Sequence, residues 1–149
     1  LALPCALGPA GVKRLKREGD GATPAGRFRL LDAYWRADRA PRPRLFLPLA
    51  AIRPGDLWCD DPGAALYNRP ARAPLKAGCE QMRRADRLYD VVVTLDHNQR
   101  PRVRGLGSAI FFHIAREGFA PTQGCVAIAP EAMRRLLPRL SRRAVLVID

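Results

Sequence analysis

The chain has 149 residues, a length that favours one hydrophobic core, so we predict a single domain over residues 1–149. Its 26 Lys and Arg against 14 Asp and Glu give a formal net charge of +12, which favours polyanionic partners. The arginines are scattered among prolines and alanines, without a recognition-helix, zinc-finger or stacking-aromatic pattern, so we do not expect a nucleic-acid partner. No apolar run approaches the ~20 residues that span a bilayer, so we also expect no transmembrane segment.

Turn-forming residues punctuate the first half of the chain. The 14 prolines and 12 glycines suit short strands joined by turns better than long helices. Residues 19–26, Gly-Asp-Gly-Ala-Thr-Pro-Ala-Gly, predict a tight loop. Residues 27–35 then partly alternate polar and apolar side chains, as a half-buried strand does. The many prolines between residues 36 and 87 disfavour helices and leave short extended pieces at 45–47 and 57–59.

The second half carries the stronger secondary-structure signals. Residues 88–95 and 108–114 are rich in β-branched and aromatic side chains and predict two buried strands. Residues 130–140 predict a helix, because a proline and a glutamate open it and apolar side chains recur at i, i+3 and i+4. Residues 144–148 predict a final core strand. The sequence therefore predicts a mainly β domain with one packed helix near the C-terminus.

The four cysteines are Cys5, Cys59, Cys79 and Cys125. None belongs to a C-x-x-C pair, which leaves zinc and thioredoxin-like chemistry without local support, so we expect neither a metal nor a cofactor. If Cys125 is reactive, a pair among the other three can form a disulfide in an oxidising compartment, or all three can remain buried thiols. Both alternatives stay open.

The segment from His113 to Cys125 is the most informative for chemistry. His113 ends a predicted buried strand, and Cys125 follows Gly124 after a loop. A thiol with its ordinary pKa of about 8.5 needs a base, and a histidine within hydrogen-bond distance supplies one. Gly124 permits a sharp turn, and the N–H groups of Gly124 and Cys125 can stabilise an oxyanion. On spacing alone, however, a cysteine is more often a small buried apolar residue without chemistry.

A family resemblance favours a reactive Cys125 over a cysteine that is only a buried apolar residue. The L,D-transpeptidase catalytic domain, or YkuD-like family, has a histidine on a strand and then a Ser/Thr-x-Gly-Cys motif. Here His113 is followed by Thr122, Gln123, Gly124 and Cys125 in that pattern. Residues 18–26 resemble the family's Gly-Asp-x-x-Thr-Pro-x-Gly turn, and residues 105–113 resemble its run into the histidine. The similarity extends over essentially the whole chain.

The resemblance implies a YkuD-like β-sandwich and a two-step thiol mechanism. Cys125 would attack the carbonyl of an L-residue joined to a D-residue in a peptidoglycan stem peptide, with His113 as base and Gly124 beside the reacting carbonyl. An amine of a neighbouring stem, typically of diaminopimelate, would resolve the thioester and form a cross-link. Water as acceptor would instead give an L,D-carboxypeptidase or related hydrolase. A non-catalytic module that binds cell wall is the alternative of another class. Family members are exported, so we expect the protein in the periplasm or cell wall. We also expect it to be a monomer.

One departure from the family pattern concerns substrate recognition. The family usually has an arginine two residues after the cysteine, and this chain has Ala127. A guanidinium can hold a carboxylate by two parallel hydrogen bonds, whereas alanine cannot. We therefore predict a non-standard donor bond, such as L-Ala to D-Glu with first-to-third cross-links, or replacement of the missing arginine by Arg116.

Several further residues are candidates for substrate binding. Thr122 and Gln123 belong to the motif itself, and Tyr89, His97 and Asn98 flank the strand predicted at 88–95. A His-Asn pair at a strand end is also common in plain turns. The carboxylates of Asp60 and Asp61, which follow Trp58, can attract an acceptor ammonium, although solvated turn residues are the commoner outcome.

Overall fold

The computed structural model describes residues 1–149, and the chain folds as a mainly β protein with one α-helix near its C-terminus, as the sequence predicts. The strands are β1 (Cys5–Ala6), β2 (Val12–Lys13), β3 (Thr23–Pro24), β4 (Gly26–Trp35), β5 (Leu49–Ala51), β6 (Asp56–Cys59), β7 (Arg69–Arg72), β8 (Cys79–Gln81), β9 (Val91–Leu95), β10 (Phe111–Ile114), β11 (Val126–Ile128) and β12 (Val145–Ile148). The α-helix is α1 (Pro130–Leu136), and two 3₁₀ turns cover Glu117–Phe119 and Leu137–Arg139.

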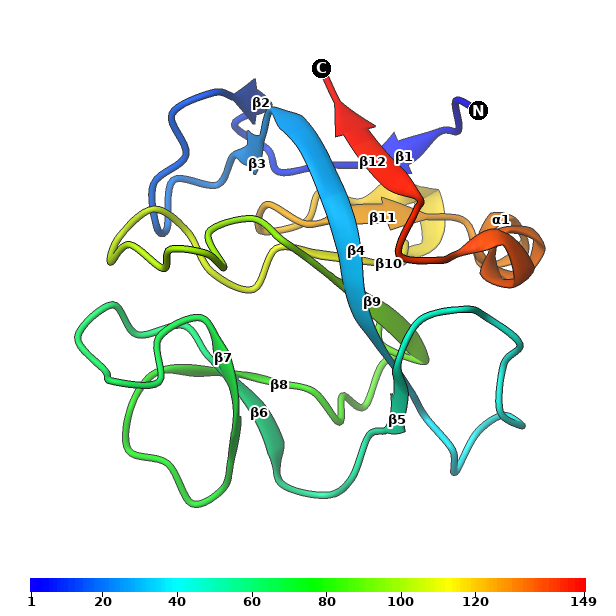
Figure 1. Cartoon of the computed structure of the whole chain (residues 1–149), viewed down its shortest axis with the longest axis horizontal. Helices are drawn as coiled ribbons and strands as arrows, with labels where there is room; N and C mark the ends of the chain where they lie inside the picture. The colour runs from blue at the N-terminus through cyan, green and yellow to red at the C-terminus, as the bar shows by residue number, and fades with distance from the viewer.

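A seven-stranded sheet forms the body of the fold. Its order is β1-β11-β10-β9-β4-β12, and β5 pairs with β4 off this path. Figure 1 shows β4 as the longest strand, crossing the molecule between β12 at one end and β5 at the other. The pairing of β10 with β11 is parallel, whereas β10 with β9 and β9 with β4 are antiparallel. The parallel pairing thus places β10, which contains His113, beside β11, the strand that begins directly after Cys125.

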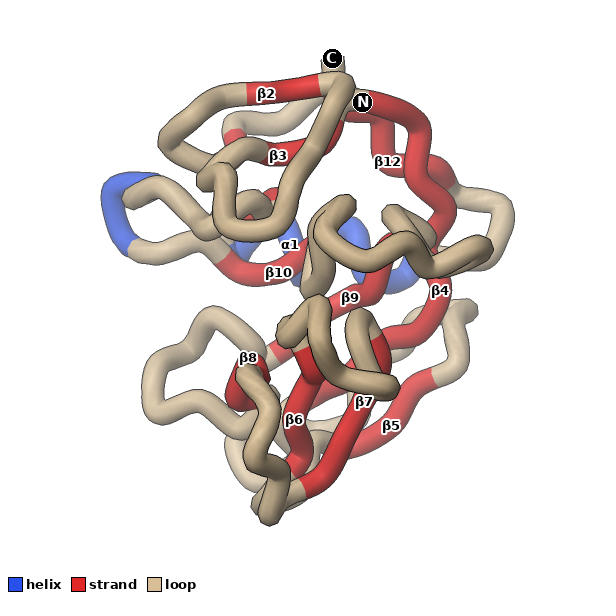
Figure 2. The backbone as a smooth tube through the Cα atoms, turned by 90° about the vertical axis from the view of Figure 1, so that its left-hand side faces the viewer, coloured by secondary structure: helices blue, strands red, loops and turns tan.

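A smaller sheet closes one end of the molecule. It has the order β7-β6-β8, and both pairs are antiparallel. In Figure 2 this sheet lies below β9 and β10, while β2 and β3 lie at the opposite end near both termini. The same view shows the loop after β10, with its short 3₁₀ turn, projecting to one side.

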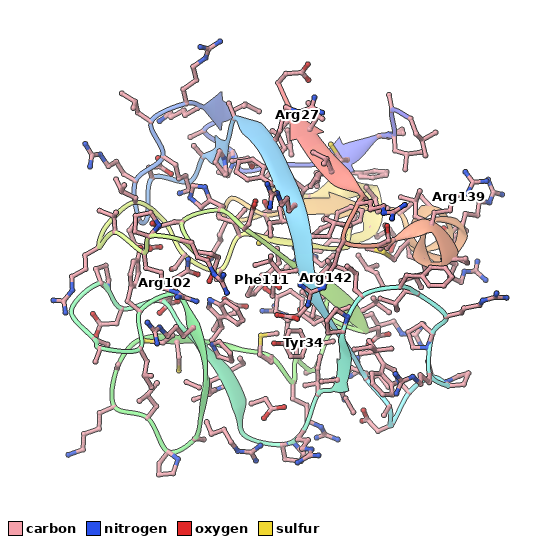
Figure 3. The ribbon with its side chains drawn as sticks, in the orientation of Figure 1. Arg27, Tyr34, Arg102, Phe111, Arg139 and Arg142 are labelled. Carbon is pink, nitrogen blue, oxygen red and sulfur yellow. The ribbon has the colours of Figure 1, made fainter.

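Two groups of buried apolar side chains hold these layers together. The larger group has 14 members and joins α1 to the large sheet, with Met133 of the helix almost fully buried. The second has 8 members around Phe111, including Tyr89, Trp58 and Cys125. Figure 3 shows Phe111 in the interior, with Arg27 and Arg139 toward the periphery. Each Å² of apolar surface that such a cluster removes from water stabilises the fold by roughly 25 cal/mol, and this is the main stabilising force in the clusters.

The structure corrects three sequence-based boundaries. The strand predicted at 88–95 begins only at Val91, because residues 87–90 form a turn in which the Asp90 N–H donates to the Arg87 carbonyl. The strand predicted at 108–114 begins at Phe111, because Ala109 has a φ of 51° that interrupts extended backbone. The extended piece expected at 45–47 is only an isolated bridge at Phe46, and the strand lies at β5 instead.

The cysteines are all free thiols, and two of them face each other. Cys59 of β6 lies directly opposite Cys79 of β8. The next pair outward is hydrogen-bonded, with the Asp60 N–H donating to the Gly78 carbonyl at 3.2 Å. Hydrogen-bonded and non-hydrogen-bonded pairs alternate along an antiparallel ladder, so Cys59 and Cys79 form a non-hydrogen-bonded pair, in which side chains approach most closely.

None of the helices has the length and apolar character needed to span a lipid bilayer.

Candidate active site

Cys125 and His113 line the same cavity, which has a volume of about 360 Å³. The reason lies in the strand register: His113 lies opposite Ala127 in the parallel pair of β10 and β11. Opposed residues of neighbouring strands point to one face, and side chains alternate faces along a strand. Cys125 stands two residues before Ala127, so its side chain shares the face of His113. The sheet therefore brings the two residues together, although eleven others separate them in the chain.

The orientation of His113 is fixed by its own strand. Nδ1 lies 2.8 Å from the carbonyl oxygen of Ile114. A carbonyl can only accept, so Nδ1 carries the hydrogen and Nε2 of the neutral ring keeps a lone pair. The ring also packs edge-on against Tyr89, with ring centroids 5.2 Å apart. The histidine is thus held as the tautomer that can accept a proton at Nε2.

Burial also keeps His113 uncharged. It lowers the pKa of His113 to about 4, against the hydrogen bond to Ile114, and the nearby Arg84 guanidinium adds to the shift. Desolvation acts in this direction because the charged imidazolium loses its hydration when buried. At neutral pH the ring is therefore a free base.

Cys125 is a buried thiol in the resting protein. Its Sγ donates to the Ala109 carbonyl at 3.2 Å and accepts from the Phe111 N–H at 3.4 Å. Burial raises the pKa of Cys125 to about 12, although the Phe111 N–H partly offsets the shift. No hydrogen bond joins Sγ to His113. The pair is a neutral thiol and a neutral imidazole, and the thiol must turn away from Ala109 before its proton can pass to His113.

Glycine is required at position 124 for two reasons. Its φ is +121°, which side chains of L-residues rarely permit, and an added Cβ would lie 2.7 Å from the Ala22 carbonyl oxygen. The Gly124 N–H donates to Thr122 Oγ1 at 3.1 Å, and this hydroxyl donates to the Cys125 carbonyl at 2.7 Å. Thr122 thereby braces the turn. Of the two N–H groups at the motif, that of Cys125 is the one without a hydrogen-bond partner in the protein.

Four of the six residues predicted to bind substrate line the cavity: Tyr89, Arg116, Thr122 and Gln123. His97 and Asn98 lie outside it. A ring nitrogen of His97 lies 2.9 Å from the Leu106 carbonyl, and the Asn98 amide donates to the carbonyls of Val103 and Gly107. These two residues shape the loop that leads to β10.

The cavity also contains charged and polar residues that the sequence did not single out. They are Glu18, Glu80, Arg84 and Ser108. Asp60, weighed above only as a weaker candidate, lines it as well. Glu80 comes from β8 of the small sheet, and Glu18 from the loop that precedes β3. Their shared position depends on how the small sheet and the N-terminal loop pack against β10, and no local sequence signal reports this packing.

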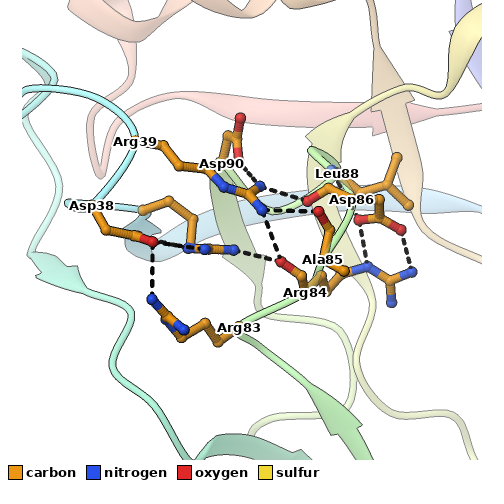
Figure 4. Close-up of polar contacts among 9 residues, drawn as sticks. Asp38, Arg39, Arg83, Arg84, Ala85, Asp86, Leu88 and Asp90 are labelled. Atoms are coloured by element: carbon orange, nitrogen blue, oxygen red, sulfur yellow. Dashed lines mark hydrogen bonds and ion pairs between the residues drawn. The ribbon is translucent and has the colours of Figure 1, made fainter.

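A network of arginines holds the loop from Arg84 to Asp90, as Figure 4 shows. Arg39 pairs with Asp90 at 2.6 Å and donates to the carbonyls of Arg84, Ala85 and Asp86. Arg36, which is buried, donates to the Arg84 carbonyl at 2.5 Å. These contacts replace regular secondary structure in fixing the loop.

The side chain of Arg84 is itself fixed. Its guanidinium makes two hydrogen bonds to Asp86, at 2.8 and 2.7 Å, and a third to Glu80 at 2.8 Å. It also lies 5.1 Å from the centroid of the Tyr89 ring, in a cation–π contact. Arg116 is far less constrained, because it is largely exposed and its nearest carboxylate oxygen, on Asp86, is 3.9 Å away.

Ala127 is one of the residues that line the cavity. It is 1% exposed, also packs with Ala6 and Ala115 in a small apolar cluster, and presents only a methyl group to the cavity. No group of three or more His, Cys, Asp or Glu side chains is placed to hold a metal ion.

Comparison with known families identifies the family of the chain. The chain matches the family model of the YkuD L,D-transpeptidase catalytic domain over residues 1–148. No curated protein and no solved structure gives a significant match. The matched region includes β10, the Thr122–Cys125 motif and the cavity between them. The chain belongs to the L,D-transpeptidase catalytic domain family.

Proposed function

We propose that this protein is a cysteine-nucleophile L,D-transpeptidase that cross-links peptidoglycan stem peptides, with Cys125 as nucleophile and His113 as base. The observation that carries the proposal is the shared cavity, in which a neutral His113 keeps its Nε2 lone pair and Cys125 keeps its thiol proton. Membership of the family supports the same class of reaction.

The first step forms a thioester. The thiol leaves the Ala109 carbonyl and gives its proton to His113 Nε2, and Sγ attacks the carbonyl carbon of an L-residue in the donor stem. The unpaired Cys125 N–H is the donor best suited to the oxyanion that results. The tetrahedral intermediate collapses, the C–N bond breaks, and the imidazolium returns its proton to the departing amine of the D-residue.

The second step resolves the thioester. An amine of an acceptor stem, in its neutral form, attacks the thioester carbonyl and loses a proton to His113 Nε2. The C–S bond breaks, Sγ recovers the proton, and a new amide links the two stems. With water in place of the amine, the same steps give a hydrolase.

The donor is proposed to differ from that of relatives with an arginine after the motif. Ala127 lines the cavity but presents only a methyl group, which cannot bind a carboxylate. Of the two arginines that line the cavity, Arg116 has fewer existing partners than Arg84, which supports it as the donor's carboxylate ligand. We propose the L-Ala to D-Glu bond as the donor bond, with first-to-third cross-links as product.

The proposed place of action is the periplasm or cell wall, where peptidoglycan is found, and the proposed active unit is a monomer. The family generally acts outside the cytoplasm.

Incubation with purified muropeptides tests this function. Fragmentation mass spectrometry of the products should reveal first-to-third cross-links, and both Cys125→Ala and His113→Ala should abolish them. Arg116→Ala should lower donor use roughly tenfold, since a charged hydrogen bond of about 1.5 kcal/mol is lost. Hydrolysis products alone would favour the hydrolase. If neither product forms and a carbapenem fails to label Cys125, the non-catalytic wall-binding module is the better account.

A further inference from the structure

The cavity contains two carboxylates that have no cation partner. Three acidic side chains line it, namely Glu18, Asp60 and Glu80. Glu80 pairs with Arg84 at 2.8 Å, whereas Glu18 and Asp60 take part in none of the ion pairs of the structure. Cations exceed anions by 26 to 14 in this chain, so unpaired carboxylates gathered in one cavity are unexpected.

The positions of these two carboxylates are held from outside the cavity. Glu18 accepts a hydrogen bond from the Tyr67 hydroxyl, and its own N–H donates to the Gly105 carbonyl at 2.8 Å. Asp60 follows β6, and its N–H donates to Gly78 across the small sheet. Burial raises the pKa of Asp60, and the neighbouring carboxylates of Glu18 and Glu80 raise it further. The negative charges are close enough to repel one another, and a bound cation would relieve this repulsion.

A buried hydroxyl in the same cavity gives a second and independent sign of a ligand. Ser108 is 7% exposed and lines the cavity, yet its Oγ has no hydrogen-bond partner in the protein. The Tyr67 hydroxyl lies close to Ser108, but it gives its proton to Glu18 and therefore cannot donate to Ser108 Oγ. Leaving a buried polar atom unpaired costs roughly 1–3 kcal/mol, so a ligand that donates to Ser108 would be bound favourably.

We propose that Glu18, Asp60 and Ser108 form a binding site for a primary ammonium group, that of the acceptor stem peptide. An alkylammonium has three N–H donors, and two carboxylates with one hydroxyl offer three acceptors. The site would hold the acceptor stem in the cavity of Cys125, and the amine attacks after it loses its extra proton. This inference rests on the proposed transpeptidase function, and it favours an amine over water as acceptor.

Direct binding tests the inference without catalysis. The probe is the stem-type tripeptide L-Ala-γ-D-Glu-L-Lys with its N-terminal α-amine blocked by formylation, so that the lysine Nε is its one primary amine, and its matched control is the same peptide with the lysine Nε acetylated. Calorimetry on the full chain carrying Cys125→Ala should detect the free amine and show roughly tenfold weaker binding after Glu18→Gln or Asp60→Asn. Glu18→Gln keeps an acceptor for Tyr67. Equal binding of the acetylated peptide would overturn the proposal.

Two further variants separate a binding role from a structural one. Asp61→Asn is the matched control, because Asp61 accepts from the Gly63 N–H at 2.8 Å and does not line the cavity; it should bind the probe as before. Ser108→Ala should weaken probe binding without lowering the melting temperature, since its Oγ has no partner to lose. A lower melting temperature with unchanged binding would assign Ser108 a structural role and contradict the proposal.

A partition experiment links the site to the reaction. With donor and amine acceptor present, the Glu18→Gln/Asp60→Asn protein should give a ratio of cross-linked to hydrolysed product at least tenfold lower than the unmodified protein. An unchanged ratio would refute the ammonium site while leaving the thioester mechanism intact. Absence of any thioester in the unmodified protein would refute the proposed function, and the binding experiment above would still decide whether the ammonium site exists.

Discussion

The Nδ1 atom of His113 lies 2.8 Å from the carbonyl oxygen of Ile114, the next residue of the same strand. This single contact fixes the tautomer of the proposed base without a third acidic residue. The imidazole takes its orientation from β10, whose place in the sheet is set by β9 and β11 on either side. The orientation of His113 thus depends on the central part of the sheet.

The first prediction concerns the protonation state of the thiol. Burial raises the pKa of Cys125 to about 12, so iodoacetamide should alkylate Cys125 slowly at pH 7 and faster as the pH rises through 9 and above. Mass spectrometry of the peptide that contains Cys125 measures the rate. Cys5, which is exposed, serves as the internal reference. A rate that is already maximal near pH 6 would indicate a resting thiolate–imidazolium pair and contradict the structure.

The second prediction concerns stability and pH. The pKa of His113 is about 4 in the folded protein and about 6.5 when unfolded, so the unfolded chain binds more protons between these values. The contribution of neutral His113 to the free energy of unfolding is therefore complete above pH 6.5 and is lost as the pH falls toward 4. At 1.36 kcal/mol per pH unit the loss is about 3 kcal/mol.

Urea unfolding at pH 7 and pH 4 measures this loss. His113→Asn removes the titrating group while keeping a polar side chain of similar reach. The free energy of unfolding of the variant should fall less between the two pH values than that of the unmodified protein, by about 3 kcal/mol. Parallel pH profiles for the two proteins would show that His113 is not a buried neutral base.

The third prediction tests the turn before Cys125. Gly124→Ala places a Cβ 2.7 Å from the Ala22 carbonyl oxygen at a φ of +121°, so it should destabilise the protein by about 2 kcal/mol or more and displace Cys125. Gly118→Ala is the matched control in the same loop, because its φ is +68° and nothing lies within 4 Å of an added Cβ. The control should cost about 1 kcal/mol. Equal losses in urea unfolding would mean that contact with Ala22 does not matter.

The fourth prediction concerns the cysteine pair of the small sheet. Cys59 and Cys79 face each other in a non-hydrogen-bonded pair, whose Cα atoms lie about 4.5 Å apart, within the range of disulfides. With oxidised glutathione as oxidant, the two thiols should lose two protons and two electrons, form one S–S bond and yield two reduced glutathiones. Cys79 is the more accessible thiol and should react first.

Peptide mapping without reduction identifies the bond. The oxidised protein should contain a Cys59–Cys79 disulfide, the exposed Cys5 should carry glutathione as a mixed disulfide, the buried Cys125 should stay titratable, and Cys79→Ser should prevent the internal linkage. A disulfide between Cys5 and another cysteine of the chain, or four free thiols after oxidation, would exclude this pairing. Because Asp60 and Glu80 adjoin the two cysteines, the bond would also make the acidic side of the cavity more rigid.

The sequence predicted the parts of the fold that have long or strongly patterned segments. The alternation in 27–35 predicted β4 within one residue, and the apolar spacing after Pro130 predicted α1 and the 3₁₀ turn that extends it. The strands β1, β2 and β3 have two residues each and show no periodicity to detect. The late start of β10 results from the positive φ of Ala109, whose N–H donates to Asn68 Oδ1, a contact between segments far apart in sequence.

The candidate site also has some residues that the sequence indicated and others that only the folded structure reveals. A local motif and a family resemblance single out Cys125 and His113 as candidates, and the structure places both in one cavity. The remaining charged residues of the cavity, such as Glu18 and Glu80, come from segments that meet only in the folded chain. The sequence suggested His97 and Asn98 as substrate-binding residues because they follow a predicted strand, but their side chains form hydrogen bonds with backbone carbonyls of the following loop. Such roles depend on tertiary contacts, which the sequence alone does not report.

Detection of an acyl-enzyme tests the central claim most directly. A donor stem tetrapeptide is mixed with the protein, the reaction is stopped with acid, and intact and peptide-level mass spectra are recorded. We predict an added acyl group on Cys125, at least a hundredfold slower formation in His113→Ala, and no adduct in Cys125→Ala. Product formation by the Cys125→Ala protein, or an acyl group on any other residue, would contradict the account.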